Sequence, residues 1–374
     1  MVLPRRAGGG QDGPAQPGRL LCLPGSGGGR RQQRRTPGRG GPRHGGITTT
    51  RVSVNKGFRT NSRARSAEPA LIRFWGVRGS IPAPGPGTVR YGGNTSCVEI
   101  RADGQIIILD AGTGLRLLGR HLLAEAKEQP LELTLLLTHT HWDHIQGLPF
   151  FSPVYQPQNH LRVLGYEGAR HGLAVVLAGQ MATPFFPVRL REVPANVRIR
   201  ELKQRRFQIG PVRVQARPAN HPGKCVGYRL FTSCGSVAFF PDHEVPVADD
   251  AGAPGRIPAP AANRAMIQFL HGADVLIMDT QFDAEEYRQH RGWGHGCMDA
   301  VVELALQAKV KTLFLFHHAP DHDDAKVARM LARARRIVAR RKGSLRVNAA
   351  REGMTVILPP AGRAGGGADA ATNG

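Results

Sequence analysis

The segment HTHWDH at residues 139–144 concentrates three imidazoles and one carboxylate within six positions. It follows an apolar run typical of a β-strand, and polar side chains at the end of an anchored strand are well placed to converge on an ion. His139 and His141 can face one ion from an extended turn, whereas Asp143 and His144 can face a second. Imidazole and carboxylate together suit zinc, iron or manganese. The segment therefore predicts two divalent metal ions, with Zn²⁺ preferred over Mn²⁺ or Fe.

A polar surface loop without a metal is the alternative interpretation of this cluster. The chain disfavours it, because further histidines and aspartates follow other apolar strands, as a two-metal site requires. The segment also resembles the HxHxDH motif of the metallo-β-lactamase superfamily, and the resemblance covers about residues 71–360. It implies an α/β fold, a four-layer αβ/βα sandwich with two metals at the sheet edges.

The resemblance implies seven metal ligands. They are His139, His141 and His221 on one metal, Asp143, His144 and His317 on the other, and Asp242 as a bridge between them. For the last ligand, His317 competes with His318, and the nearby Pro320 favours His317. His243 and His322 are expected to be bystanders. Asp110, which follows a strand in LDAGTGLR, resembles the structural aspartate that lies behind the ligands.

Two later segments resemble elements of the ribonuclease Z and phosphoribosyl cyclic phosphodiesterase branch. The start of the domain resembles the same branch in the segment RFWGVRGSIPAPGPGTVRYGGNTSCVEI. VLIMDTQF contains Asp279, and GWGHGCMDA contains His295. The resemblance implies that Asp279 orients His295, which assists the leaving group, so the expected catalytic residues are Asp143, Asp279 and His295. The alternative is a histidine that only bonds its own Gly-rich turn.

The protein is therefore predicted to be a binuclear metal-dependent hydrolase. The activity we favour is that of a phosphodiesterase, which uses metal-activated water to hydrolyse small or cyclic phosphodiesters. Three alternatives stay open. The first is a ribonuclease Z-like RNA processing nuclease, and the second is a hydrolase of thioesters, lactones or β-lactams. The third is an RNA-binding protein that uses the basic N-terminal arm. A homodimer is also possible, and no membrane partner is expected.

The charge of the chain is concentrated at its beginning. The formal net charge is +23, but residues 1–70 hold 14 Lys and Arg against 2 acids, which leaves +11 for the other 304 residues. We expect residues 1–69, rich in Arg, Gly and Pro, and residues 361–374 to be disordered tails around a hydrolase domain at 70–360. Three interpretations of the first tail stay open. It is an Arg-rich arm that binds RNA, an organelle transit peptide, or a solvated tail, which includes an upstream start codon wrongly chosen.

Five scattered cysteines, never in a CxxC pair, indicate neither disulfides nor a thiolate zinc site, which fits a reducing cytoplasm. The sequence has no run of eighteen apolar residues and no secretory signal, so we expect a soluble protein. The phosphodiesterase is thus predicted to be cytoplasmic.

Apolar runs and helical periodicity predict mixed sheets covered by helices. The predicted strands are Leu71 to Phe74, Ser96 to Arg101, Gln105 to Leu109, Leu131 to Leu137, Leu161 to Leu164, Val212 to Ala216, Val226 to Phe231, Val237 to Phe240, Val275 to Met278, Thr312 to Phe316 and Met354 to Leu358. The predicted helices are Gly114 to Ala126, Gly172 to Gly179, Met298 to Ala308 and Asp324 to Val338. Ala251 to Ala262 is predicted to be a Pro/Ala/Gly loop.

Overall fold

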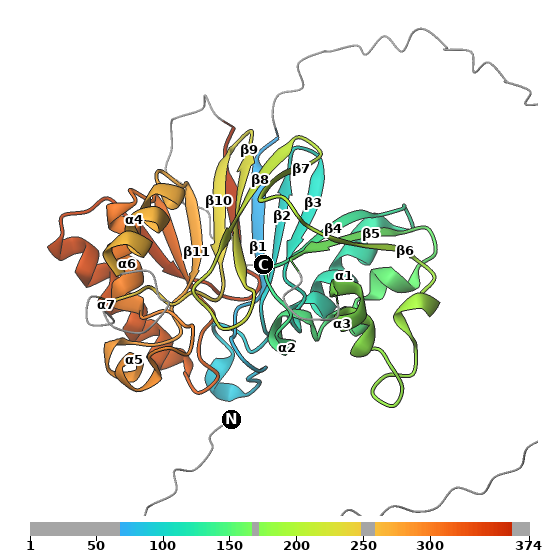
Figure 1. Ribbon diagram of the computed structural model, residues 1–374, viewed down its shortest axis with the longest axis horizontal. Helices are drawn as coiled ribbons and strands as arrows, with labels where there is room; N and C mark the ends of the chain where they lie inside the picture. Colours follow the sequence, from blue (N-terminus) through green and yellow to red (C-terminus); the bar gives the residue numbers. More distant parts are fainter. Residues whose placement is uncertain (1–67, 167–171, 248–258, 361–374) are drawn as a thin grey trace, which may run out of the picture. The chain divides into compact units, whose positions relative to one another are not determined.

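The computed structural model describes residues 68–166, 172–247 and 259–360. Within these ranges the chain forms two seven-stranded sheets with helices on their outer faces (Figure 1). The expected tails at 1–69 and 361–374 lie outside the described residues, except for positions 68 and 69, which precede the first strand.

The first sheet combines an antiparallel and a parallel half. In spatial order its strands are β14 (Thr355–Leu358), β1 (Ala70–Gly76), β2 (Cys97–Ala102), β3 (Gln105–Leu109), β4 (Glu132–Leu137), β5 (His160–Gly165) and β6 (Asn196–Glu201). β3 to β6 run parallel, so their carboxyl ends share one edge of the sheet. In β4, five consecutive buried residues follow Glu132, as expected for a strand covered on both faces.

The second sheet repeats this division in reverse chain order. Its strands are β13 (Arg346–Ala349), β12 (Thr312–Phe316), β11 (Val275–Asp279), β10 (Gly235–Phe240), β9 (Val226–Thr232), β8 (Val212–Pro218) and β7 (Arg206–Ile209). β10 to β13 are parallel, whereas β7 to β10 form antiparallel pairs. All five residues of β11 and of β12 are buried.

Helices cover the outer face of each sheet. The helices are α1 (Gly114–Ala126), α2 (Trp142–Ile145), α3 (Leu173–Gly179), α4 (Ala259–Leu270), α5 (Ala284–His290), α6 (Met298–Gln307) and α7 (Asp324–Arg340). Side chains of α1 and α3 share one apolar cluster with β4 and β5, whereas those of α4, α6 and α7 share another with β11 and β12. A third cluster fills the space between the sheets, where Phe74 of β1 meets Phe314 and Phe316 of β12. The expected αβ/βα sandwich of four layers is therefore confirmed.

The predicted strands and helices all exist, with ends displaced by a few residues. The loop predicted for Ala251 to Ala262 is wrong at its end, because α4 begins at Ala259; residues 251–258 lie outside the described ranges. Pro260 falls in the first turn of that helix, where a backbone N–H has no helical partner, so it does not prevent the helix. The sequence also missed α4 as a helix, together with β6, β7, β13, α2 and α5.

The described helices include none that is both long and apolar enough to cross a lipid bilayer.

Candidate metal centre

The carboxyl ends of strands from both sheets meet at one edge of the sandwich. His139, His141 and His144 follow β4, His221 follows β8, and Asp242 follows β10. Asp279 is the last residue of β11, and His317 comes directly after β12. Parallel strands end at the same edge of their sheet, so residues more than a hundred positions apart become neighbours.

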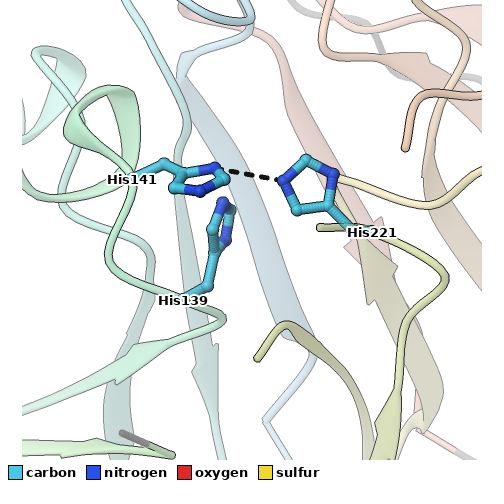
Figure 2. A group of neighbouring side chains, drawn as sticks. All are labelled: His139, His141 and His221. Carbon is cyan, nitrogen blue, oxygen red and sulfur yellow. Dashed lines mark hydrogen bonds between the residues drawn. The ribbon is translucent and has the colours of Figure 1, made fainter. Parts of the chain in front are cut away.

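The first group consists of His139, His141 and His221 (Figure 2), which each offer a ring nitrogen within 4.8 Å of the others. The His221 Nε2 and His141 Nδ1 atoms are 3.1 Å apart, and the ring centroids of His139 and His141 are 4.4 Å apart. His221 reaches this position because its Nδ1 donates to the carbonyl oxygen of Gly294 at 3.1 Å. His139 is buried, whereas His141 is exposed.

The second group consists of Asp143, His144 and His317, with Asp242 beside it. The Oδ2 atom of Asp143 lies 3.0 Å from His144 Nε2 and 3.2 Å from His317 Nε2. Asp242 directs Oδ2 to His144 Nε2 at 3.0 Å and Oδ1 to His317 Nε2 at 3.4 Å. Asp242 Oδ1 is also 3.9 Å from His221 Nε2, so this carboxylate lies between the two groups.

Three buried atoms at the centre of these groups have no hydrogen-bond partner in the described residues: His139 Nε2, His144 Nε2 and Asp242 Oδ2. The 3.0 Å approach of the last two therefore lacks the directionality of a hydrogen bond. Leaving such atoms unsatisfied costs about 1 to 3 kcal/mol each. Divalent cations bound between them would satisfy all three atoms, so the donor set fits metals that accept nitrogen and oxygen ligands.

Burial and neighbouring charges set the protonation of these groups. Burial lowers the pKa of His139, His141 and His221, which favours the neutral imidazole that a metal requires. Burial opposes ionisation of Asp143 and Asp242, but neighbouring histidines, chiefly His144 and His317, outweigh it and hold the pKa of both carboxyls well below the usual range.

Asp110 lies behind the second group and fixes His144. Its Oδ2 atom accepts from His144 Nδ1 at 2.8 Å, and its Oδ1 atom accepts from the backbone N–H of Thr138 at 2.8 Å. The hydroxyl of Ser96 donates to the same carboxylate at 3.1 Å. Asp110 has φ 60°, a left-handed conformation uncommon outside glycine, so the surrounding structure imposes the position of its carboxylate.

Two contacts at this edge were not anticipated from the sequence. Gln281 Oε1 accepts from His317 Nδ1 at 2.9 Å, and the backbone N–H of Ser80 donates to Asp143 Oδ2 at 2.8 Å. His317 itself has φ 60°. A Cβ atom on Gly79 would lie 2.3 Å from His317 Nδ1, so only glycine fits there. The position of Gln281, two residues after Asp279, was the available signal for its role.

His295 and Asp279 form an ion pair next to the second group. The distance between His295 Nδ1 and Asp279 Oδ2 is 3.0 Å, and His295 Nδ1 lies 3.6 Å from Asp242 Oδ1. Burial lowers the pKa of His295, but Asp279 and the other carboxylates outweigh it and raise the pKa to about 9. The structure thus brings together all nine residues that the sequence singled out: the seven expected ligands, Asp279 and His295.

The remaining histidines of the region point elsewhere. His318 bonds the carbonyl oxygen of Ala350 at 2.9 Å and belongs to none of the described groups that could hold a metal, whereas His317 belongs to two. His243 Nδ1 accepts from the backbone N–H of Asn220 at 2.9 Å. His322 bonds Glu286 at 2.9 Å. These bonds hold the three side chains to other parts of the fold.

Comparison with known proteins identifies the domain. A family profile described as "Beta-lactamase superfamily domain" matches residues 105–318, a stretch that contains every residue of the two groups. Ribonuclease BN of Salmonella paratyphi C is 25% identical over 267 residues, covering 62% of this chain and 84% of the relative. Ribonuclease Z of Picrophilus torridus is 22% identical over 288 residues, covering 68% and 87%.

Among solved structures, the metallo-β-lactamase fold protein YhfI from Bacillus subtilis aligns with a TM-score of 0.55 and 19% identity, covering 78% of this chain and 100% of that protein. The two proteins therefore share this fold.

Proposed function

This chain belongs to the β-lactamase superfamily and is a hydrolytic enzyme, and we propose that it is a binuclear metal-dependent phosphodiesterase acting on small or cyclic phosphodiesters. The observation that carries the proposal is the His295–Asp279 ion pair beside the paired ligand groups. A histidine held by a carboxylate is suited to protonate a leaving oxygen or to balance phosphate charge. The relatives named ribonuclease support phosphodiesters as the substrate class.

The proposed metal ligands are the seven residues of the two groups and their bridge: His139, His141, Asp143, His144, His221, Asp242 and His317. The orphaned atoms of His139, His144 and Asp242 fit this assignment. Two divalent ions, Zn²⁺ by preference, would supply a Lewis acid for the phosphoryl group and a water that ionises near neutral pH.

The residues of the chain have distinct proposed tasks. Asp143 is held by Ser80, His144 and His317, and its proposed tasks are to bind metal and to accept a hydrogen bond from the attacking water. His295 turns Nδ1 to Asp279, which leaves Nε2 as the atom that can reach a leaving oxygen. Asp279 is therefore a positioning residue that orients the ring of His295.

RNA processing is the second candidate function, favoured by the names of the ribonuclease Z and ribonuclease BN relatives. We rank it second because residues 70–360 contain no long basic, Gly-rich insertion that could clamp a large RNA. A cytoplasmic location, a homodimer and RNA binding by residues 1–69 stay predictions of the sequence.

The test uses His141→Ala, which removes an exposed ligand and should leave the fold intact. We expect bound zinc, measured by elemental analysis, to fall from about two ions per chain, and hydrolysis of bis(p-nitrophenyl) phosphate to fall at least about 100-fold. The control is His160→Ala, which removes a half-exposed histidine paired with Glu132 at the other end of β5. Full activity of the His141 variant without metal, or wild-type activity on β-lactams alone, would refute the proposal.

A further inference from the structure

Two tryptophans beside the candidate metal centre expose most of their side chains. Trp142 is 76% exposed and Trp293 is 55% exposed. Tryptophan offers a large apolar surface whose burial stabilises a fold, so its display to solvent gives up that stabilisation. In the described part of the chain, the side chain of Trp142 makes no hydrogen bond and no ring contact. Packing of the fold therefore does not account for its presence.

Both tryptophans adjoin the histidines of the first group. Trp142 follows His141 directly, and Trp293 precedes Gly294. His141 lies 3.1 Å from His221, and His221 lies 3.1 Å from the carbonyl oxygen of Gly294. Two short contacts thus connect the backbone next to one tryptophan with the backbone next to the other. The first tryptophan follows a strand of the first sheet, and the second lies between α5 and α6 on the side of the second sheet.

The member of the cluster that solvent reaches most is His141, which precedes Trp142 in the chain. His141 is exposed, whereas the side chains of His221 and His295 are only 3% and 12% exposed. The other members of the cluster are buried: His139, Asp143, His144, Asp242, Asp279 and His317. Solvent therefore reaches the cluster chiefly at His141, the neighbour of Trp142 in the chain, and a substrate's phosphate has to approach from that side.

The loop that carries Trp293 is fixed in place by a buried carboxylate. Glu244 accepts from the backbone N–H groups of Gly292 at 2.8 Å and Gly294 at 3.0 Å, on either side of the tryptophan. The two glycines have φ 80° and 87°, so the backbone turns sharply at both positions. The Trp293 ring also packs edge-on against His290 at 4.8 Å. The indole is thus held in place before any ligand arrives, which lowers the entropic cost of binding.

We propose that Trp142 and Trp293 form a stacking subsite for the nucleobase of a nucleotide phosphodiester. The inference rests on the proposed phosphodiesterase function, and it names the substrate class. Every base has a flat π face that stacks on exposed aromatic side chains, and loss of one such ring weakens binding roughly 5- to 150-fold. The sugar and phosphate then extend from the base toward the ligand cluster, so the subsite selects nucleosides over simple alkyl esters.

The test compares two chromogenic substrates with the same leaving group, thymidine 5′-(p-nitrophenyl phosphate) and methyl p-nitrophenyl phosphate, on the zinc-loaded full chain. The measured quantity is the ratio of their kcat/KM values, which cancels any general effect on the metal centre. We expect a high ratio for the wild type and a fall of roughly 5- to 150-fold in Trp142→Ala and in Trp293→Ala. The matched variants Trp142→Phe and Trp293→Phe retain a ring and should keep the ratio within about threefold. An unchanged ratio in both alanine variants would overturn the subsite.

A binding measurement separates this subsite from the proposed reaction. Calorimetric titration of AMP and of ribose 5-phosphate requires no turnover, and the two ligands differ only by the base. If the wild type hydrolyses neither phosphodiester, the proposed function fails; a tryptophan-dependent preference for AMP would still uphold the subsite. Equal affinity of the wild type for the two ligands would refute it, even with a fully active enzyme.

Discussion

At the scale of single residues, the site depends on side chains that touch no substrate. His144 has one ring nitrogen among the ligand groups and gives the other to Asp110. This bond selects which nitrogen of the ring faces the cluster and fixes the ring plane. His317 is held in the same way by Gln281 and His295 by Asp279. The chemistry of the cluster thus depends on a layer of oxygen acceptors behind it.

Replacement of Asp110 by asparagine tests this dependence. Asp110→Asn keeps the size of the side chain but removes the negative charge behind His144 and one acceptor site. We expect the affinity for zinc, measured by competition with a chromogenic chelator, to fall about 10- to 100-fold. Asp103→Asn, in the turn between β2 and β3, is the control and should keep the wild-type affinity. Equal affinities of the two variants would show that Asp110 does not tune the metal.

The close approach of the His317 ring dictates that residue 79 is glycine. In Gly79→Ala the new Cβ atom would lie 2.3 Å from His317 Nδ1 and 2.9 Å from Gln281 Oε1, so the histidine has to move. We expect at least about a tenfold loss of zinc affinity together with loss of hydrolysis, because ligand orientation is disturbed. Gly179→Ala, where nothing lies within 4 Å, should behave as the wild type in both assays. Wild-type zinc affinity of Gly79→Ala would contradict the assigned fit.

At the scale of elements, the centre depends on how the two sheets are joined. The hydroxyl of Tyr228 on β9 donates to the carbonyl oxygen of Leu137, the last residue of β4, at 2.6 Å. The backbone N–H of Val226 donates to the carbonyl oxygen of Thr138 at 3.1 Å. These bonds connect the second sheet to the end of the strand that precedes residues 139–144, and they fix that segment relative to the second sheet.

Removal of the Tyr228 hydroxyl measures this connection. Tyr228→Phe should lower the free energy of unfolding, measured by urea denaturation, by about 1 to 3 kcal/mol, because a buried acceptor loses its partner. Tyr166→Phe is the matched control, since its hydroxyl bonds the carbonyl oxygen of Gln204 in an exposed setting, and it should cost less. A cost for Tyr228→Phe no larger than for the control would mean that this bond does not support the junction.

At the scale of the whole molecule, buried histidines connect stability to pH. His322 is 5% exposed and bonds Glu286, with Lys326 and Asp283 also nearby. Burial lowers its pKa, and the opposing effect of Glu286 does not compensate. Below the unfolded value of about 6.5 the unfolded chain therefore binds a proton that the folded chain does not. Protonation of His322 in the unfolded chain therefore lowers the free energy of unfolding as the pH falls below about 6.5, and this effect is absent above that pH.

His322→Gln should accordingly flatten the pH dependence of stability. We expect the free energy of unfolding of the wild type to fall more steeply between pH 7.5 and 5 than that of the variant, with both proteins in EDTA so that metal release does not contribute. Glutamine preserves a donor toward Glu286. Parallel curves for the two proteins would contradict a lowered pKa of His322 in the folded state.

The sequence by itself determined the residue types of the centre and most of the elements that carry them. Residues 139–144 needed no tertiary information, because four donors follow one apolar strand within six positions. Buried strands such as β4 and β12 were predictable from their continuous apolar runs. The strands β6 and β13 were not, because three charged residues in β6, and Arg346 and Asn348 in β13, obscure a short apolar pattern.

Only the tertiary structure decided which of these residues act together. Gln281 and Ser80 gain their roles by meeting His317 and Asp143 across 36 and 63 positions of the chain, and local pattern carries no information about such contacts. The same holds for Glu244, which fixes the loop of Trp293 from 50 residues away. Sheet register and strand order set these distances, so a motif can name candidate ligands, but the packing of two sheets assembles the site.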